Sequence, residues 1–595
     1  MHTFEKPDNL VELIEKSVEK YPDNKMFGTK NEAGEYDWVT YREVGIRIDN
    51  LRGGLSWAGI EKGDAVGIIA NNRKEWAIAA YATFGLGGRY IPMYQYELVK
   101  VWKHIINDGG IKLLLVATRE IYDQIEDMRD ELPGLEKLYL IEGEGENTMS
   151  DLENKGATSP VPSIRPKPED IAVLIYTSGT TGDPKGVLLS HGNFTSNVIA
   201  GYKVFPDLDE KDRGFSILPW AHSFGQTGEL YLFSHIGGSV GIMGDVTTLA
   251  DDMGKVRPTF LVAVPRVFNK IYAGLWAKMD ETGGLAKKLF EMGIASARKR
   301  RELSEKGQSD LLANLKFKIA DTVVFNKIRG RFGGRLKGAL SGSATMNVEI
   351  GYFFSDLGIP VFDCYGLTET TPAATMNGPH AHKPGSVGRP IEHVRVEIDT
   401  TSSDDDEDGE IIIYGPNVMQ GYHNKSRATK EVMTADGGFR TGDRGRLDED
   451  GYLFITGRIK EQYKLQNGKY VFPAAIEEEM KLHPLVENAM IYGEGRPFNT
   501  CLVVPDFIVL EKYAAEHSLP TDPEELVERD DIQEMIASEI TNFLKGKFGG
   551  YEIPKKFLYL SEGFTLDNGT LTQTMKLKRR IVMELHKNQI EELYV

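Results

Sequence analysis

Apolar segments of strand length alternate with a helical segment between residues 64 and 117, and this alternation constrains the fold most. Residues 65–70 and 89–92 are short apolar runs, residues 76–84 have a helical pattern, and another strand-like run follows at residues 112–117. Strand, helix and strand in repetition predict parallel sheets with helices on their faces. We therefore expect an α/β fold.

The length and charge of the chain limit what it can be. With 595 residues it exceeds what one hydrophobic core supports, so two or more domains are expected. Its 70 basic and 88 acidic side chains give a net charge of −18, which argues against a nucleic-acid partner and against non-specific binding to anionic membranes. An anionic ligand must therefore be held by local groups.

Cysteine content and hydropathy bear on location. Cys364 and Cys501 are too few for a disulfide framework, and the first six residues lack the apolar core of a signal peptide. Apolar runs fall short of the ~18 residues that a membrane-spanning helix needs. We expect a cytoplasmic protein. Peripheral contact with a membrane surface stays open, as does the choice between a monomer and a homodimer.

A polar loop follows the apolar run at residues 171–175. Residues 176–186 read Tyr-Thr-Ser-Gly-Thr-Thr-Gly-Asp-Pro-Lys-Gly. Glycines let backbone N–H groups converge on an anion, hydroxyls add donors and the lysine adds a positive charge, which together indicate a phosphate-binding loop. The Walker pattern does not apply, because no Gly-Lys-Ser/Thr closes the loop. The residues with these roles are Thr177, Ser178, Gly179, Thr180, Thr181, Gly182, Lys185 and Gly186.

Residues 363–370, Asp-Cys-Tyr-Gly-Leu-Thr-Glu-Thr, carry side chains suited to a nucleotide. Tyr365 offers a flat face on which an adenine ring can stack. Thr368 offers a hydroxyl to a phosphate, and Glu369 offers a hard oxygen to Mg²⁺, which prefers one or two carboxylates together with phosphate oxygens. Each residue alone is better explained as structural. In combination with the loop at 176–186, they favour binding of ATP and Mg²⁺.

These two segments resemble signature motifs of the adenylate-forming superfamily, which includes acyl-CoA synthetases, luciferases and the adenylation domains of peptide synthetases. The resemblance runs over nearly the whole chain. It implies a large N-terminal domain, residues 1–458, with parallel-rich sheets flanked by helices and a β-barrel-like subdomain. A small mobile α+β C-terminal domain, residues 459–595, would follow. The loop at 176–186 would bind the β and γ phosphates of ATP.

The resemblance also implies where the acyl substrate and the adenine lie. His222 ends the segment Leu-Pro-Trp-Ala-His and would line the acyl pocket beside the reacting carboxylate. Ser343 and Ala344 occupy the place of an adenine-contact turn. The family sequence there is Ser-Gly-Gly-Ala-Pro, and this chain departs from it at Ser343 and Thr345.

The resemblance implies further nucleotide contacts in two other segments, residues 363–366 and residues 443–458. Asp363 and Gly366 belong to the predicted nucleotide-binding set of residues 363–370. Asp443, in a Thr-Gly-Asp segment, has two carboxylate oxygens suited to vicinal ribose hydroxyls. Arg458 would reach the ribose and the phosphate. Thr-Gly-Asp alone is more often a solvated turn, so this assignment depends on the resemblance.

The resemblance assigns three residues to the two half-reactions. Lys460 would be the hinge about which the small domain turns. Gly468 would face the pantetheine tunnel during thioester formation, where its lack of a side chain permits a close approach. Lys576 would be the mobile catalytic lysine, and the motif spacing favours it over Lys578 although the family's proline is Gln573 here.

A long helical, charge-rich insertion lies between residues 272 and 327. Its pattern alone predicts a solvated amphipathic helix pair. Its flanks and content resemble the long-chain acyl-CoA synthetases in particular. We therefore expect a fatty acid with a long chain as the substrate.

The resemblance implies a two-step ligase. A fatty carboxylate would attack ATP to give acyl-AMP and pyrophosphate, and coenzyme A would then displace AMP. Lys185, His222, Thr368, Glu369 and Lys576 are the expected catalytic residues. Three alternatives stay open: transfer of the acyl group to a carrier protein, a luciferase-type oxygenase, and a nucleotide-binding module without turnover.

Two other patterns are better explained as structure. Residues 237–241, Gly-Gly-Ser-Val-Gly, match the nucleophile motif of hydrolases, but no helix-forming run follows, so a glycine turn into a strand is expected. The acidic run at 403–410 lies between two strand-like segments and fails the EF-hand spacing. A solvated hairpin loop accounts for it.

Overall fold

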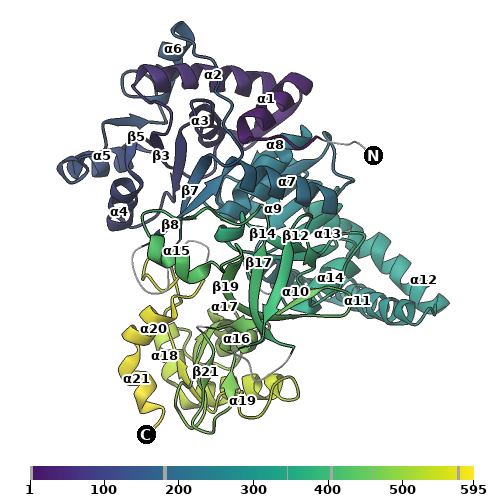
Figure 1. Cartoon of the computed structure of the whole chain (residues 1–595). Coiled ribbons are helices and arrows are strands. Elements are labelled where there is room, and N and C mark those ends of the chain that lie inside the picture. Colours follow the sequence, from purple (N-terminus) through teal and green to yellow (C-terminus); the bar gives the residue numbers. More distant parts are fainter. Residues whose placement is uncertain (1–4, 178–183, 345, 402–406, 460, 573–575) are drawn as a thin grey trace. The chain divides into compact units, whose positions relative to one another are not determined.

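The computed structural model describes residues 5–177, 184–344, 346–401, 407–459, 461–572 and 576–595 (Figure 1). The chain divides into two compact units. The large unit comprises Met1–Glu397, Ile412–Thr441 and Asp448–Leu453. The small unit comprises Ile398–Ile411, Gly442–Leu447 and Phe454–Val595.

A seven-stranded sheet forms the N-terminal part of the large unit, in the order β18-β8-β7-β4-β3-β5-β6. Strands β7, β4, β3, β5 and β6 run parallel to one another. Strand β8 is antiparallel to β7, and β18 is antiparallel to β8. The predicted alternation of strands and helices is therefore confirmed. The strands are β3 (Ala65–Ile69), β4 (Arg89–Met93), β5 (Ile111–Val116), β6 (Lys137–Leu140), β7 (Ile171–Thr177), β8 (Lys185–Ser190) and β18 (Gly421–Tyr422).

Helices pack on the sheet because apolar side chains cover both its faces. Every residue of β3 is buried, as expected of a strand between two helical layers. The helix that connects β3 to β4 is buried from Trp76 to Gly85. The helices referred to below are α2 (Tyr41–Trp57), α3 (Lys74–Gly85), α4 (Val99–Gly109) and α6 (Met149–Thr158).

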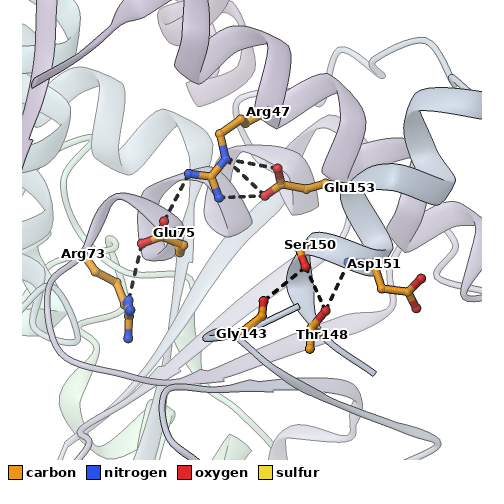
Figure 2. Close-up of polar contacts among 8 residues, drawn as sticks. All are labelled: Arg47, Arg73, Glu75, Gly143, Thr148, Ser150, Asp151 and Glu153. Atoms are coloured by element: carbon orange, nitrogen blue, oxygen red, sulfur yellow. Dashed lines mark hydrogen bonds and ion pairs between the residues drawn. The ribbon is translucent and has the colours of Figure 1, made fainter. Parts of the chain in front are cut away.

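Polar contacts fix three of these helices to one another (Figure 2). Arg47 on α2 forms ion pairs with Glu153 on α6, at 2.8 Å, and with Glu75 on α3, at 3.1 Å. Thr148 caps α6 by accepting a hydrogen bond from the backbone N–H of Asp151. These contacts hold the helical layer that covers the parallel strands.

Two further sheets complete most of the large unit. One has the order β11-β12-β13-β14-β15, with the first three strands parallel, and the other has the order β2-β1-β10-β9. The strands are β1 (Lys25–Lys30), β2 (Tyr36–Thr40), β9 (Arg213–Ser216), β10 (Ser239–Ile242), β11 (Phe260–Ala263), β12 (Gly338–Ser341), β13 (Val361–Gly366), β14 (Ala373–Met376) and β15 (Arg389–Pro390).

The insertion contains more helices than the predicted pair. It consists of α10 (Pro265–Thr282), α11 (Gly284–Glu305) and α12 (Leu311–Ala320), and a π-helical turn then leads to α13 (Asn326–Arg331). The pair was predicted because the charge pattern does not show the breaks at Gly283 and at 306–310. Figure 1 shows α11 and α12 side by side at the margin of the large unit.

A four-stranded sheet, β16-β17-β19-β20, contributes residues to both units. Its strands are β16 (Arg395–Asp399), β17 (Gly409–Tyr414), β19 (Phe439–Leu447) and β20 (Leu453–Arg458). A barrel-like subdomain was predicted here. Among the described residues, these four strands form a sheet and no closed barrel. The predicted strands on either side of the acidic run are present as β16 and β17, and residues 402–406 lie outside the described ones.

The small unit has the predicted α+β character. A hairpin, β21 (Tyr463–Lys464) and β22 (Tyr470–Val471), precedes a sheet of order β23-β24-β25. The sheet strands are β23 (Val486–Tyr492), β24 (Thr500–Pro505) and β25 (Lys556–Tyr559), and the helices used below are α16 (Pro473–Met480), α17 (Phe507–Glu516) and α20 (Arg579–Leu585). Apolar side chains of strands and helices form its own core.

Three smaller expectations can be compared with the fold. Gly237 ends a short helix in the left-handed conformation and leads into β10, so the hydrolase-like pattern is a glycine turn. Cys364 and Cys501 are buried and free. Within the described ranges, no helix combines the length and apolar character needed to cross a membrane.

Candidate active site

The predicted phosphate loop connects two antiparallel strands. Thr177 at the end of β7 pairs with Lys185 at the start of β8, and its hydroxyl donates to the Lys185 carbonyl at 3.5 Å. Lys185 therefore lies at the base of the loop. Five predicted phosphate-binding residues lie outside the described part of the chain: Ser178, Gly179, Thr180, Thr181 and Gly182.

Helix α4 holds both ends of this loop. The Tyr176 hydroxyl donates to Asp108 Oδ2 at 2.7 Å, and His104 Nε2 lies 3.1 Å from the Pro184 carbonyl oxygen. Burial raises the pKa of Tyr176 well above its usual value, and the Asp108 carboxylate raises it further, so the hydroxyl stays protonated as a donor. No local pattern in the sequence indicated this role for His104 or Asp108.

Tyr422 connects the loop lysine to the predicted metal ligand. Its hydroxyl donates to Glu369 Oε1 at 2.8 Å, and Lys185 Nζ lies 5.1 Å from the centre of its ring. Burial, followed by the neighbouring Glu369 carboxylate, raises the pKa of Tyr422 well above its usual value. One side chain thus contacts a cation with its ring face and an anion with its hydroxyl.

The backbone around Tyr422 reinforces this connection. The Met419 N–H donates to the Glu369 carbonyl at 2.9 Å, and the His423 N–H donates to the Gly186 carbonyl at 2.8 Å. The segment therefore spans the distance between the two nucleotide motifs. Sequence reasoning missed Tyr422, because a tyrosine in a two-residue strand carries no signal by itself.

The second motif begins on strand β13 and continues into a 3₁₀ turn. Tyr365 and Asp363 are half-buried on this strand, and Thr368 and Glu369 begin the 3₁₀ turn Thr368–Thr370. A Cβ on Gly366 would lie 1.8 Å from the Pro372 carbonyl oxygen, so this position requires glycine. Burial raises the pKa of Asp363 to about 7.

The predicted adenine-contact turn lies at the edge reached by β13. Strands β12 and β13 are adjacent and parallel, so Ser343 and Ala344 after β12 lie at the same sheet edge as the end of β13. Ser343 has a φ of 71°, in the left-handed region where the family has glycine. Ala344 is exposed, and Thr345 lies outside the described residues.

His222 follows β9 and begins the turn into the π-helical segment Gly225–Tyr231. It is half-buried, and its Nδ1 accepts a hydrogen bond from the Phe224 N–H at 3.2 Å. This bond leaves the proton of a neutral ring on Nε2. The ring therefore presents a donor at that nitrogen.

Glu229 organises the segment that leads to His222. This buried carboxyl accepts from the N–H groups of Ile217 and Leu218, both at 3.0 Å, from the Ser216 hydroxyl at 2.7 Å and from Trp220 Nε1 at 3.2 Å. Burial raises its pKa to about 8, against the opposing effect of these four donors. Glu229 follows the segment Gly-Gln-Thr-Gly, and nothing in its local sequence indicated this role.

An apolar cavity of about 30 Å³ is lined by Phe224, two residues after His222, and by Pro372, two residues after the second motif. It has room for about two water molecules. An acyl chain would therefore require lining side chains to move apart. The lining includes Phe205, Phe224, Leu232, Phe260, Leu340 and Met376.

The remaining predicted residues belong to the small unit. Arg458 Nε pairs with Asp443 Oδ1 at 2.8 Å, with Asp443 buried and Arg458 exposed. Gly468 has a φ of 81° in the β21–β22 hairpin and no atom within 4 Å of its missing Cβ, so the turn conformation explains the glycine. Lys460 lies outside the described residues.

Lys576 pairs with Thr572 through backbone contacts. It is exposed, its N–H donates to Thr572 Oγ1 at 3.0 Å, and its carbonyl accepts from the Thr572 N–H at 2.8 Å. Arg579 then anchors the chain by donating to Glu477 Oε1 on α16 at 2.8 Å. Hydrogen bonds therefore hold the backbone at Lys576 and the side chain of Arg579.

The donor chemistry suits Mg²⁺ bound together with a nucleotide. Among the described residues, no cluster of three or more His, Cys, Asp or Glu could hold a metal by itself. Mg²⁺ in nucleotide sites typically takes one or two carboxylates and completes its shell with phosphate oxygens and water. The half-buried Glu369, close to the loop base at Lys185, fits that pattern.

Family models match most of the chain. The model described as AMP-binding enzyme matches residues 14–423, and the model described as AMP-binding enzyme C-terminal domain matches residues 460–595.

Curated relatives match over nearly the full length. Long-chain-fatty-acid–CoA ligase FadD15 of Mycobacterium bovis is 31% identical over 578 residues, covering 94% of this chain and 93% of its own. Peroxisomal long chain acyl-CoA synthetase 6 of Arabidopsis thaliana is 32% identical over 614 residues, covering 98% of this chain and 85% of its own.

Solved structures share the fold. The adenylation domain of a carboxylate reductase from Mycobacterium chelonae superposes with a TM-score of 0.81 at 23% identity, covering 99% of this chain and 92% of its own. Anthranilate CoA ligase AuaEII, in complex with anthranoyl-AMP, has a TM-score of 0.75 at 20% identity and covers 99% of each chain. With the predicted motifs, the family models and these relatives in agreement, the chain belongs to the AMP-binding enzyme family.

Proposed function

We propose that this protein is an AMP-forming ligase that joins a long-chain fatty acid to coenzyme A. The observation that carries the proposal is the contact of one side chain, Tyr422, with both Lys185 and Glu369. It brings the base of the phosphate loop and the second nucleotide motif together. The names of the full-length relatives supply the acyl and thiol substrates.

In the first step a carboxylate oxygen attacks the α-phosphorus of ATP, the bond to pyrophosphate breaks, and acyl-AMP forms. No general base is needed, because a carboxylic acid with a pKa of roughly 4 is ionised at neutral pH. The difficulty is bringing two anions together. Lys185 offsets phosphate charge, and the Thr368 hydroxyl is the expected donor to the α-phosphate.

Glu369 would hold Mg²⁺ in this site, together with phosphate oxygens. When bound, this ion neutralises phosphate charge and orients the phosphate chain. The Tyr422 hydroxyl fixes the Glu369 carboxylate, and Tyr365 offers its ring to the adenine.

The acyl chain would enter the apolar cavity lined by Phe224, which follows His222 by two residues. The Nε2 proton of His222 suits a carboxylate oxygen, and Glu229 fixes the Ser216–Trp220 backbone that leads to this histidine. Because the cavity is small, binding a long chain implies rearrangement of its aromatic lining.

In the second step the thiol of coenzyme A displaces AMP from the acyl group. We infer two domains, residues 1–458 and 459–595, with Lys460 as the hinge between the half-reactions. Lys576 would act in the first step and the Gly468 turn in the second. The nucleotide role of Asp443 and Arg458 is supported by their position in family motifs.

One experiment tests the proposal. The protein is supplied with ATP, Mg²⁺ and fatty acids of graded length, with either coenzyme A or an acyl carrier protein, and AMP and thioester are measured. The expected result is acyl-CoA formation that is greatest with long chains. Thioester formation on the carrier protein alone, or AMP release without any thioester, would contradict it.

A further inference from the structure

Helix α12 has an exposed apolar stripe. Leu311, Leu315 and Ile319, spaced four residues apart, have exposed fractions of 86%, 56% and 44%, and Leu312 is 59% exposed. At about 100° per residue these four side chains fall within roughly 100° of arc. A stripe of this kind is unusual on a surface helix, whose apolar face normally packs inward.

The opposite face of α12 already has its partner. Ala313 and Ala320 are buried, the Arg300 guanidinium of α11 lies 4.1 Å from the centre of the Phe317 ring, and Arg300 Nε donates to Asn314 at 2.8 Å. The exposed stripe is therefore a second apolar face. Packing of α12 on α11 does not account for it.

Basic side chains flank the stripe on both sides. The same helical angles place the exposed Lys318 beside Leu311 and the exposed Lys316 beside Leu312. Residues 311–331 contain five basic residues and one acidic residue, a balance of +4 in a chain of net charge −18. The acidic one, Asp321, is paired with Arg329 at 2.6 Å.

We propose that α12 docks on the surface of a bilayer that contains anionic lipids. Apolar side chains on one face, with lysines at the margins whose ammonium groups reach the headgroups, are the features of a helix that lies in the membrane interface. Anionic headgroups complement the local positive charge despite the negative charge of the whole chain. The surface, Leu311, Leu312, Leu315, Lys316, Lys318 and Ile319, is called the α12 stripe.

The position of the α12 stripe suits this role. Figure 1 shows α12 at the margin of the large unit, beside α11. Delivery of a membrane-dissolved fatty acid to the site would follow, and this link rests on the proposed function. The docking itself does not depend on it.

Co-sedimentation with lipid vesicles tests the docking. The full-length protein is mixed with vesicles of phosphatidylcholine alone or with about 30% phosphatidylglycerol, at low and high salt. We expect binding to the anionic vesicles that weakens with salt. Replacing both Lys316 and Lys318 by Gln should reduce it by about 25-fold, at roughly fivefold per lysine. The combined change Leu311→Ser, Leu315→Ser and Ile319→Ser should reduce it by at least about tenfold.

A matched variant separates the stripe from general surface hydrophobicity. Ile46, Ile508 and Leu585 are exposed to 54%, 83% and 59%, and lie on other helices. Their replacement by Ser should leave vesicle binding unchanged. The triple Ser change at Leu311, Leu315 and Ile319 is called the stripe variant. An equal loss of vesicle binding in the control variant and in the stripe variant would overturn the proposal, and so would undiminished vesicle binding by the stripe variant. Thermal unfolding of each variant shows whether it is folded.

Three further results are decisive. If the stripe joins two copies of the chain, the stripe variant converts dimer to monomer in analytical ultracentrifugation while vesicle binding is retained, which would refute docking. Vesicle binding without any acyl-CoA formation would refute the proposed function and support the docking. Turnover of long-chain acid without vesicle binding would do the opposite.

Discussion

Replacing Tyr422 by Phe removes one hydroxyl and leaves the ring in place. That hydroxyl donates to Glu369 Oε1 at 2.8 Å, and a hydrogen bond to a charged group contributes about 1.5–3 kcal/mol. Glu369 is half-buried, so water can replace part of the lost donation and the lower end applies. A loss of about 1.5 kcal/mol of transition-state stabilisation corresponds to roughly tenfold in kcat/KM for ATP.

Replacing Tyr422 by Leu removes the ring as well. Lys185 then loses its contact with the ring face, worth about 0.5–2 kcal/mol, and the buried site loses packing. The Leu variant should therefore be less stable than the Phe variant by several kcal/mol and should also bind the nucleotide more weakly. The Phe variant should differ from the unmodified protein only in the lost hydrogen bond to the Glu369 carboxylate.

The assay measures initial rates of AMP formation against Mg²⁺ and ATP, together with the shift in melting temperature caused by MgATP. For Tyr422→Phe we expect about a tenfold higher Mg²⁺ requirement, a smaller thermal shift and an unchanged KM for the fatty acid. Tyr414→Phe is the control, since that hydroxyl donates to the surface residue Asp436. Equal Mg²⁺ dependence in the two Phe variants would refute the reasoning.

Four other changes have defined outcomes. Lys576→Ala should abolish acyl-AMP formation and spare thioester formation from preformed acyl-AMP, and equal loss of both would count against Lys576. Lys460→Pro should spare the first half-reaction and impair the second; an unimpaired second step would remove the hinge assignment. Burial raises the pKa of Glu229 from 4.5 to about 8, so between these pH values the folded chain keeps a proton that the unfolded chain has lost. The contribution of Glu229 to stability is therefore complete below about pH 4.5 and declines as the pH rises toward 8. In urea titrations Glu229→Gln should flatten that decline, and a wild-type pH profile in this variant would disprove the raised pKa. Ser343→Gly should raise the unfolding free energy by up to about 1 kcal/mol, because φ is 71° there, and a loss of stability would show that the Ser343 side chain has its own role.

The sequence predicted those parts of the molecule that have local patterns. Alternation of strand and helix gave the parallel strands β3, β4 and β5, because buried parallel strands are short, continuous apolar runs. The loop between β7 and β8 was visible because glycines, hydroxyls and a lysine are concentrated in it. The helix count of the insertion was wrong, since breaks between solvated helices leave the charge pattern unchanged.

Residues defined by distant contacts could not be predicted in this way. Tyr422 acts on Lys185 and Glu369, and Glu229 acts on the backbone of Ser216–Trp220. Nothing near either residue distinguishes it from an ordinary core tyrosine or glutamate. Only the folded chain shows that each of them meets groups from other segments.

The position of Tyr422 also depends on side chains far from it in sequence. Strand β18 has only two residues, so its pairing with β8 is a weak constraint. The buried Asn193 donates to the carbonyls of Pro416 and Val418, at 2.7 and 2.9 Å, and Thr371, just after the Glu369 turn, donates to the Asn417 carbonyl at 2.8 Å. Because these bonds come from the helix after β8 and from the second motif, the segment can reach its place only when both motifs are folded. The contact between Lys185 and Glu369 through Tyr422 is therefore a property of the assembled large unit, and formation of the site is coupled to its folding.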